Sequence, residues 1–231
     1  MKLTLIRHTE SPDLTIALAA RRCYSSKPST EIEESLSAEK VEKLIMKLRE
    51  RNHLSPFEHA VFTFAADGLS RSLSHQLVRH RIASYSQESQ RYVDYSKPGF
   101  VPPIIPPTVK ADSKAYEIFS EAVKSAVNTY NLLVKEGIPP EDARYVLPNA
   151  IETKIVFTMN ARSLFNFFEQ RCCMKAQWEI RHLAALMLKE CKQAAPLAFK
   201  FAGAPCLSAS HPYCRENDPS CPNYRFVEKN K

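Results

Sequence analysis

Glycine is the residue whose scarcity most constrains this chain, because only four glycines occur among its 231 residues. They are Gly68, Gly99, Gly137 and Gly203, and no two of them lie within thirty residues of each other. The glycine-rich loops that wrap nucleotide phosphates, G-x-G-x-x-G and G-x-x-x-x-G-K-[ST], therefore cannot exist here. Any nucleotide that binds this chain must be held without such a loop.

The charge balance favours anionic partners. The chain carries a formal net charge of +7 and has a sequence pI near 9.0. Its 44% hydrophobic and 25% charged residues are typical of a globular protein, which excludes disordered and fibrous classes. The positive excess suits ligands such as small phosphates or nucleic acid.

The cellular location is predicted from segments that the sequence lacks. No apolar run has the length of a signal peptide or of a membrane span, so we expect no membrane association. The seven cysteines are an odd number, which indicates free thiols in a reducing cytoplasm.

The pattern of apolar residues predicts an α+β fold with a mixed sheet flanked by long helices. Strands are expected near 2–6, 60–66 and 151–158, and helices near 13–20, 38–51, 113–135, 161–171 and 177–194. These elements do not alternate regularly as β-α-β units, which disfavours a doubly wound sheet. We expect one catalytic domain over 1–205 and an irregular, cysteine-containing tail over 206–231. The proline-rich segment 97–108 is expected to be a loop inside that domain.

The densest polar cluster runs from Gln76 to Tyr92 and contains three arginines, one histidine, three glutamines and three serines. Leu69, Leu73 and Leu77 are spaced as on one face of a helix that continues into Arg79-His80-Arg81. Gln76, Arg79 and His80 would then share one helical face. Guanidinium forks suit phosphate oxygens, so this cluster is either a nucleotide site or a solvated basic surface.

Arg171 closes an otherwise apolar stripe formed by Leu164, Phe167 and Phe168. A guanidinium drawn toward a core needs an anion or another acceptor there, unless it bends outward to water. On the opposite stripe, Arg162 and Asn166 are four residues apart and could present a polar edge to a ligand.

Metal binding and covalent catalysis have little support in the sequence. Cys206, His211, Cys214 and Cys221 could supply four zinc ligands, but no C-x-x-C pair occurs among them, so we expect no metal site. No serine lies in a G-x-S-x-G elbow, and no cysteine has an evident histidine partner in the sequence.

Arg79-His80-Arg81, followed by seven residues and Ser89, forms the signature R-H-R-x7-S, and with it the chain resembles flavin-dependent thymidylate synthases. Further segments resemble that family in its own order: His53-x-Ser55-Pro-Phe-Glu-His59, Ala143-Arg144-x-Val-Leu-Pro148, Asn160-Ala-Arg-Ser-Leu164, and Ala176-Gln-Trp-Glu179. The chain departs at Ser86 and Gln87, where some members have Asn and Glu, and in its cysteine-containing tail.

The resemblance implies that the chain has the fold of this family and methylates dUMP to dTMP. Methylenetetrahydrofolate would supply the carbon, and FAD, reduced by NADPH, would supply the hydride. It also implies a homotetramer with active sites between subunits.

The resemblance further implies roles for individual residues. The FAD contacts would be Ser55, Arg79, His80, Arg81, Gln87, Asn160, Arg162 and Asn166. The dUMP contacts would be Gln76, Arg79, Ser89, Gln90, Arg91, Arg144 and Arg171. Arg171 would activate the pyrimidine, and His53 would lie where folate or nicotinamide approaches.

The sequence leaves one alternative from a different class of protein, a nucleic-acid-binding module. The Arg79–Arg91 segment, with Tyr85 and Tyr92 as stacking platforms, could belong to an RNA- or DNA-binding module. The sequence shows no continuous basic and aromatic face elsewhere, and we therefore expect no nucleic-acid partner.

Overall fold

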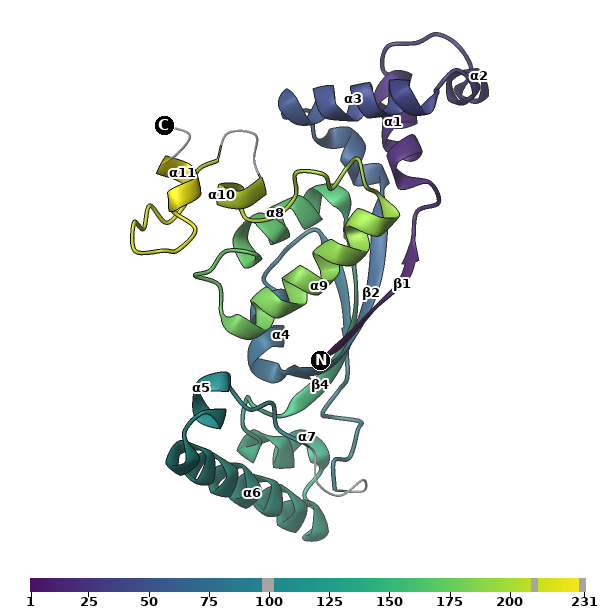
Figure 1. The fold of residues 1–231 in the computed structure, drawn as a ribbon. Coiled ribbons are helices and arrows are strands. Elements are labelled where there is room, and N and C mark those ends of the chain that lie inside the picture. Colours follow the sequence, from purple (N-terminus) through teal and green to yellow (C-terminus); the bar gives the residue numbers. More distant parts are fainter. Residues whose placement is uncertain (97–101, 209–211, 229–231) are drawn as a thin grey trace. The chain divides into compact units, whose positions relative to one another are not determined.

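The computed structural model describes residues 1–96, 102–208 and 212–228 (Figure 1). Helices and strands mix in the order along the chain that the sequence predicts, so the α+β class is confirmed. The chain divides into two compact units built from interleaved segments. Unit 1 comprises 1–2, 66–79 and 85–156, and unit 2 comprises 3–65, 80–84 and 157–231.

Four strands form one sheet in the order β1 (Lys2–His8), β2 (Val61–Ser70), β4 (Glu152–Asn160) and β3 (Ala83–Gln87). Its strands are antiparallel rather than mixed in direction. Ala161 donates its amide to the carbonyl of Ala60 at one end of the β2–β4 pair, and Arg71 donates to the carbonyl of Ile151 at the other. Side chains alternate along both strands, so Phe62, Phe64 and Ile155 are buried while their sequence neighbours are more exposed.

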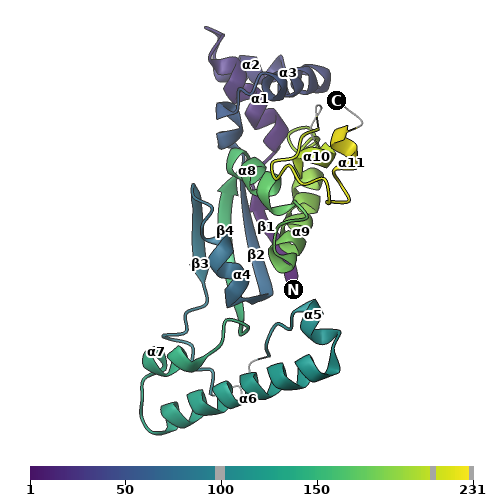
Figure 2. The ribbon, with the colours of Figure 1, turned by 90° about the vertical axis from the view of Figure 1, so that its left-hand side faces the viewer.

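Unit 2 contains most of the helices. They are α1 (Pro12–Arg22), α2 (Ser29–Glu34), α3 (Ala38–Glu50), the 3₁₀ turn η1 (Ser55–His59), α8 (Ala161–Arg171), α9 (Trp178–Ala194), α10 (Pro205–Ser208) and α11 (Arg225–Glu228). Helices α8 and α9 lie side by side (Figures 1 and 2). The aromatic rings of Phe57, Phe62, Phe165 and Phe168 meet edge to face around this core, directly or through Phe199.

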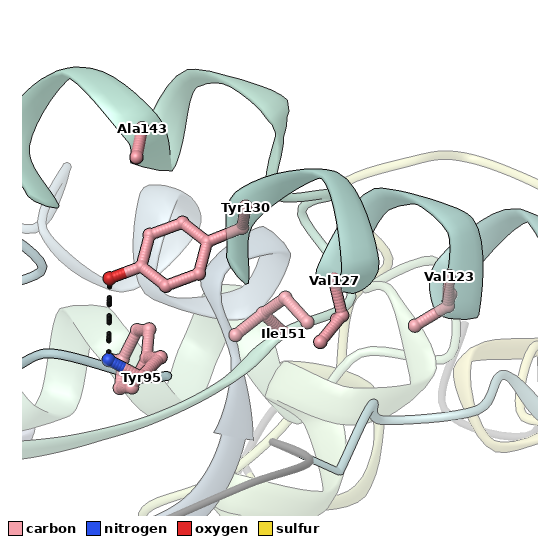
Figure 3. Close-up of a cluster of buried hydrophobic side chains, with 6 residues drawn as sticks. All are labelled: Tyr95, Val123, Val127, Tyr130, Ala143 and Ile151. Carbon is pink, nitrogen blue, oxygen red and sulfur yellow. Dashed lines mark hydrogen bonds between the residues drawn. The ribbon is translucent and has the colours of Figure 1, made fainter. Parts of the chain in front are cut away.

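Unit 1 has its own core (Figure 3). Its helical elements are α4 (Arg71–Leu77), α5 (Pro107–Lys110), α6 (Ser113–Lys135), α7 (Pro140–Ala143) and the 3₁₀ turn η2 (Arg144–Val146). Val123, Val127 and Tyr130 on one face of α6 pack with Tyr95 and Ile151. The Tyr130 hydroxyl accepts a hydrogen bond from the backbone amide of Tyr95 at 3.3 Å.

Helix α6 has the bounds that the sequence predicts. The Asp112 side chain caps its first turn by accepting a hydrogen bond from the amide of Ala115, and Gly137 follows its end with a φ of +85°. The helix predicted from Leu69 into Arg81 is present but shorter, because Leu69 belongs to β2 and α4 runs only from Arg71 to Leu77. The strand β3 is an element that the sequence analysis missed.

Other expectations about organisation stay predictions. The division into one catalytic domain over 1–205 and a tail over 206–231 is not tested by the structure. Part of the proline-rich loop lies outside the described residues. Across the described ranges, none of the helices is both long and apolar enough to cross a membrane.

Candidate active site

The segment Arg79-His80-Arg81 forms a turn between α4 and β3. Helix α4 is capped at its start by the Ser70 hydroxyl and ends at Leu77, so Gln76, Arg79 and His80 do not share a helical face as predicted. Ile82, next in the chain, has a φ of +61°, which is strained for a β-branched residue. This backbone reversal lets the buried imidazole of His80 and the exposed guanidinium groups of Arg79 and Arg81 face different surroundings.

Arg171, the last residue of α8, has the acceptor that its position on an apolar stripe requires. Its Nε donates a hydrogen bond to Nε2 of His80 over 2.9 Å. The imidazole packs edge-on against the ring of Phe167 at a centroid distance of 4.8 Å. Arg171 is partly buried, and this partial loss of solvent lowers the pKa of its guanidinium from the ordinary value.

The His80 imidazole is neutral at physiological pH. Burial, followed by the adjacent positive charge of Arg171, lowers its pKa to about 4. Since Nε2 accepts from Arg171, the single ring proton of the neutral form resides on Nδ1.

Three of the predicted flavin and folate residues gather at one cavity in unit 2. His53, Ser55 and Arg162 line a space of about 320 Å³ together with residues from the end of α1 and from α3. Arg162 also pairs with Glu58 in η1. Asn52, two residues after the end of α3, has a φ of +54° and turns the chain, which places His53 and the first residue of η1, Ser55, at this cavity.

The other predicted residues on α8 hold different positions. Asn160 uses its side-chain oxygen to cap α8, accepting a hydrogen bond from the amide of Ser163 at 2.9 Å. Asn166 lines a second space of about 860 Å³, also in unit 2, whose wall includes Arg49 and Lys200. Arg162 and Asn166 are both exposed on one side of α8, as their spacing predicts.

The predicted nucleotide residues fall in unit 1, with Arg171 as the exception. Glu141 brings two of them together: its carboxylate lies 2.6 Å from Nε of Arg91, and its carbonyl accepts from Nε of Arg144 at 3.0 Å. Ser89 accepts a hydrogen bond from the amide of Arg91. The side-chain amide of Gln87, which is predicted to contact the flavin, donates hydrogen bonds to the hydroxyls of Ser74 and Thr153 within the unit.

Arg71 is a charged residue of this region that the sequence analysis missed. It is half-buried at the start of α4, and burial lowers its pKa, with nearby Arg144 acting in the same direction. Tyr95 and Glu88 act in the opposite direction, so the positive charge of Arg71 is already partly balanced within unit 1. Arg71 lies in the first turn of α4, where its positive charge opposes the helix dipole. An arginine at such an unfavourable position can be recognised from the sequence.

Among the residues that the structure describes, the cysteines do not form a metal centre. All seven are free, and across the described residues no group of three or more His, Cys, Asp or Glu side chains is placed to hold a metal ion. His211, one of the four zinc candidates, lies outside the described residues, so that set as a whole is not tested. Burial raises the pKa of Cys206, and the nearby thiols of Cys173, Cys214 and Cys221 add to this increase.

The fold and these side chains define a class of protein. An α+β chain without glycine loops, with Arg162 at one cavity, Arg49 and Lys200 at the other and further arginines exposed or half-buried elsewhere, is suited to binding phosphate-bearing ligands. Residues 4–197 match the family model described as thymidylate synthase complementing protein, and the chain belongs to that family.

Curated relatives agree with this assignment. A protein from Geobacter sulfurreducens is 50% identical over 221 residues, which cover 96% of this chain and 94% of the relative. One from Clostridium tetani is 47% identical over 237 residues, covering 96% and 93%. One from Sulfolobus acidocaldarius is 42% identical over 219 residues, covering 94% and 82%. All three are named flavin-dependent thymidylate synthase, so the resemblance inferred from the sequence motifs is confirmed.

Proposed function

We propose that this chain is a flavin-dependent thymidylate synthase that converts dUMP to dTMP. The methylene carbon of methylenetetrahydrofolate replaces the hydrogen on C5 of the pyrimidine, and a hydride originating from NADPH brings it to the methyl level. The products are dTMP, tetrahydrofolate and NADP⁺. Support comes from membership of the family, from the names of the relatives and from the arginines described above.

Arg171 is the single observation that carries this proposal. Apart from the bond from Nε to His80, its guanidinium has no hydrogen bond to any of the described residues, so Nη1 and Nη2 are available to a ligand. C5 of uracil is a poor nucleophile until electron density moves into the ring. A partly buried guanidinium against the N3–O4 edge would stabilise the negative charge that develops there. We assign Arg171 this activating role.

The donor groups of unit 2 suit a flavin dinucleotide. Ser55, Arg162 and Asn166 present a hydroxyl, a guanidinium and an amide at the two cavities, and Arg81 is an exposed cation without a protein partner among the described residues. The two arginines can neutralise a diphosphate, and the hydroxyl and amide can donate hydrogen bonds to it, in place of a glycine-rich loop. We infer that they bind FAD with Arg79, His80, Gln87 and Asn160. When bound, FAD supplies the hydride after reduction by NADPH.

His53, exposed at the rim of the smaller cavity, would meet folate or nicotinamide.

The polar side chains of unit 1 suit the nucleotide substrate. We infer that Arg91 and Arg144 meet the phosphate of dUMP, because their Nη groups are not occupied by the bonds that Glu141 makes to their Nε atoms. Gln76, Arg79, Ser89 and Gln90 would add neutral and charged donors around it.

We also infer a homotetramer whose active sites form between subunits, working in the cytoplasm. Ile82, Tyr92 and Tyr145 are 77%, 82% and 84% exposed beside the candidate residues, and apolar side chains exposed next to a site fit burial by another copy of the chain. The seven free thiols fit a reducing compartment.

An absorption spectrum of the purified protein, before and after NADPH, tests the function together with an assay for dTMP. We expect a flavin band that NADPH bleaches, and dTMP that forms only when dUMP and methylenetetrahydrofolate are both present. A colourless protein that takes up no added FAD and forms no dTMP would refute the proposal.

The nucleic-acid alternative has no support from the comparisons. Tyr85, one of its two stacking platforms, is half-buried and donates its hydroxyl to the carbonyl of Leu77.

A further inference from the structure

Arg171 is held differently from the other arginines of the candidate site. Arg162 and Arg91 both pair with carboxylates, those of Glu58 and Glu141. Arg171 instead bonds to an imidazole that comes from 91 residues away in the chain. Its partner therefore carries no negative charge.

The surroundings of His80 keep that imidazole in place. Its exposed fraction is only 7%, and the ring lies against Phe167, which is itself fully buried one turn before Arg171 on α8. Helix α8 therefore supplies both the ring of Phe167, against which the imidazole packs, and the guanidinium of Arg171, which donates a hydrogen bond to it. A protonated imidazole could not accept the bond from Arg171, so the contact requires the neutral ring.

A neutral acceptor has a specific consequence for the guanidinium. A carboxylate at this position would offset the positive charge of Arg171 and compete with a ligand for it. The His80 bond uses only Nε, which fixes the plane of the group and leaves its charge uncompensated. Fixed orientation matters because a displacement of about 1 Å at a reacting group can cost about 10²-fold in rate.

We propose that His80 is the positioning residue for Arg171, and that its neutral imidazole orients the guanidinium so that Nη1, Nη2 and the full positive charge face the substrate. This inference rests on the proposed function, because it assigns the substrate to Arg171. It adds to His80 a role distinct from the flavin contact that the family resemblance implies.

Variants of His80 separate these two roles. His80→Leu removes the acceptor, whereas His80→Gln returns an amide oxygen near the position of Nε2. At saturating FAD, which compensates for any weaker flavin binding, we expect His80→Leu to lose about 10²-fold in kcat for dTMP formation, with a smaller change in KM for dUMP. His80→Gln should recover most of that loss. His182→Leu, which changes an exposed histidine on α9, is the matched control and should behave as the wild type.

A double-mutant cycle tests whether His80 acts through Arg171. In an Arg171→Lys background the Nε donor is gone, so adding His80→Leu should cause little further loss. Additive losses would overturn the proposal, and so would wild-type activity of His80→Leu once its flavin site is saturated.

NMR supplies a readout that does not depend on activity. The Nε–H proton of Arg171 should exchange slowly with water in the wild type, faster in His80→Leu, and slowly again in His80→Gln. Fast exchange in the wild type would overturn the proposed pairing, even if His80→Leu fails to fold. A wild-type protein that forms no dTMP, with a protected Nε–H, would refute the proposed function and leave the pairing intact.

Discussion

The Nε atom of Arg91 lies 2.6 Å from Oε2 of Glu141, so an arginine assigned to the substrate phosphate already has an anionic partner. The pair is exposed, and an exposed ion pair is easily exchanged for another. On the proposed assignment, Glu141 would order Arg91 before the nucleotide binds and would compete with the phosphate afterwards.

Glu141→Gln tests this competition. The variant keeps a hydrogen-bond acceptor beside Arg91 but removes the negative charge, so we expect KM for dUMP to fall by about two- to fivefold. Steady-state kinetics at low ionic strength measure the effect, and added salt should reduce it. Glu136→Gln, a change at an exposed acidic residue directly after α6 whose carboxylate has no partner among the described residues, serves as control. A raised KM would show that the carboxylate helps the substrate to bind.

Arg171→Ala removes the group assigned to pyrimidine activation. We expect methylation to fall by at least about 10²-fold while flavin stays bound, because the role concerns the transition state of the substrate. Product assays and the flavin absorbance of the purified variant measure the two properties. If the variant loses its flavin as well, the assigned role is wrong.

Arg81→Ala offers a test of flavin binding that is free of structural side effects. Arg81 is exposed and has no hydrogen bond or ion pair with any residue that the structure describes, so the melting temperature of the flavin-free protein should not change. We expect the bound flavin per chain to fall. Arg51→Ala, at an exposed arginine after α3, should retain it. An intact flavin spectrum in Arg81→Ala would contradict the assignment.

Tyr130 allows the core of unit 1 to be tested. Tyr130→Phe removes a hydroxyl that accepts from the amide of Tyr95, and we expect a loss of about 1 kcal/mol in the free energy of unfolding. Tyr130→Ala also removes a fully buried ring and should cost about 3–5 kcal/mol. Urea denaturation measures both. Equal costs for the two variants would mean that the ring contributes nothing to packing.

The lowered pKa of His80 predicts a pH dependence of stability. The folded chain holds this imidazole neutral down to about pH 4, whereas the unfolded chain protonates it near its ordinary pKa of 6.5. Between these values the unfolded state binds more protons, so the free energy of unfolding rises with pH across this window and levels off above it. Urea denaturation from pH 4.5 to 7.5 should show a weaker pH dependence in His80→Gln than in the wild type. The same slope in both proteins would show that His80 does not contribute.

Local pattern was enough to predict much of the fold. Helix α6 matches its predicted bounds because an amphipathic repeat, an aspartate cap and a terminal glycine all act within the same segment. Strand β3 was missed because Ala83–Gln87 is short and polar, and its extended form depends on pairing with β4. The leucine spacing that predicted a helix from Leu69 is equally compatible with a strand that ends in a capped helix.

For the site, the residue types alone indicated the arginines, the missing glycine loop and the family to which the chain belongs. They did not indicate what each arginine meets. That Arg171 bonds to His80, that Arg162 bonds to Glu58 and that Arg71 lies near Arg144 depend on contacts between residues far apart in the sequence. Periodicity describes only neighbours within a few residues, whereas the charge and orientation of these guanidinium groups depend on burial and partners that arise only when the chain has folded.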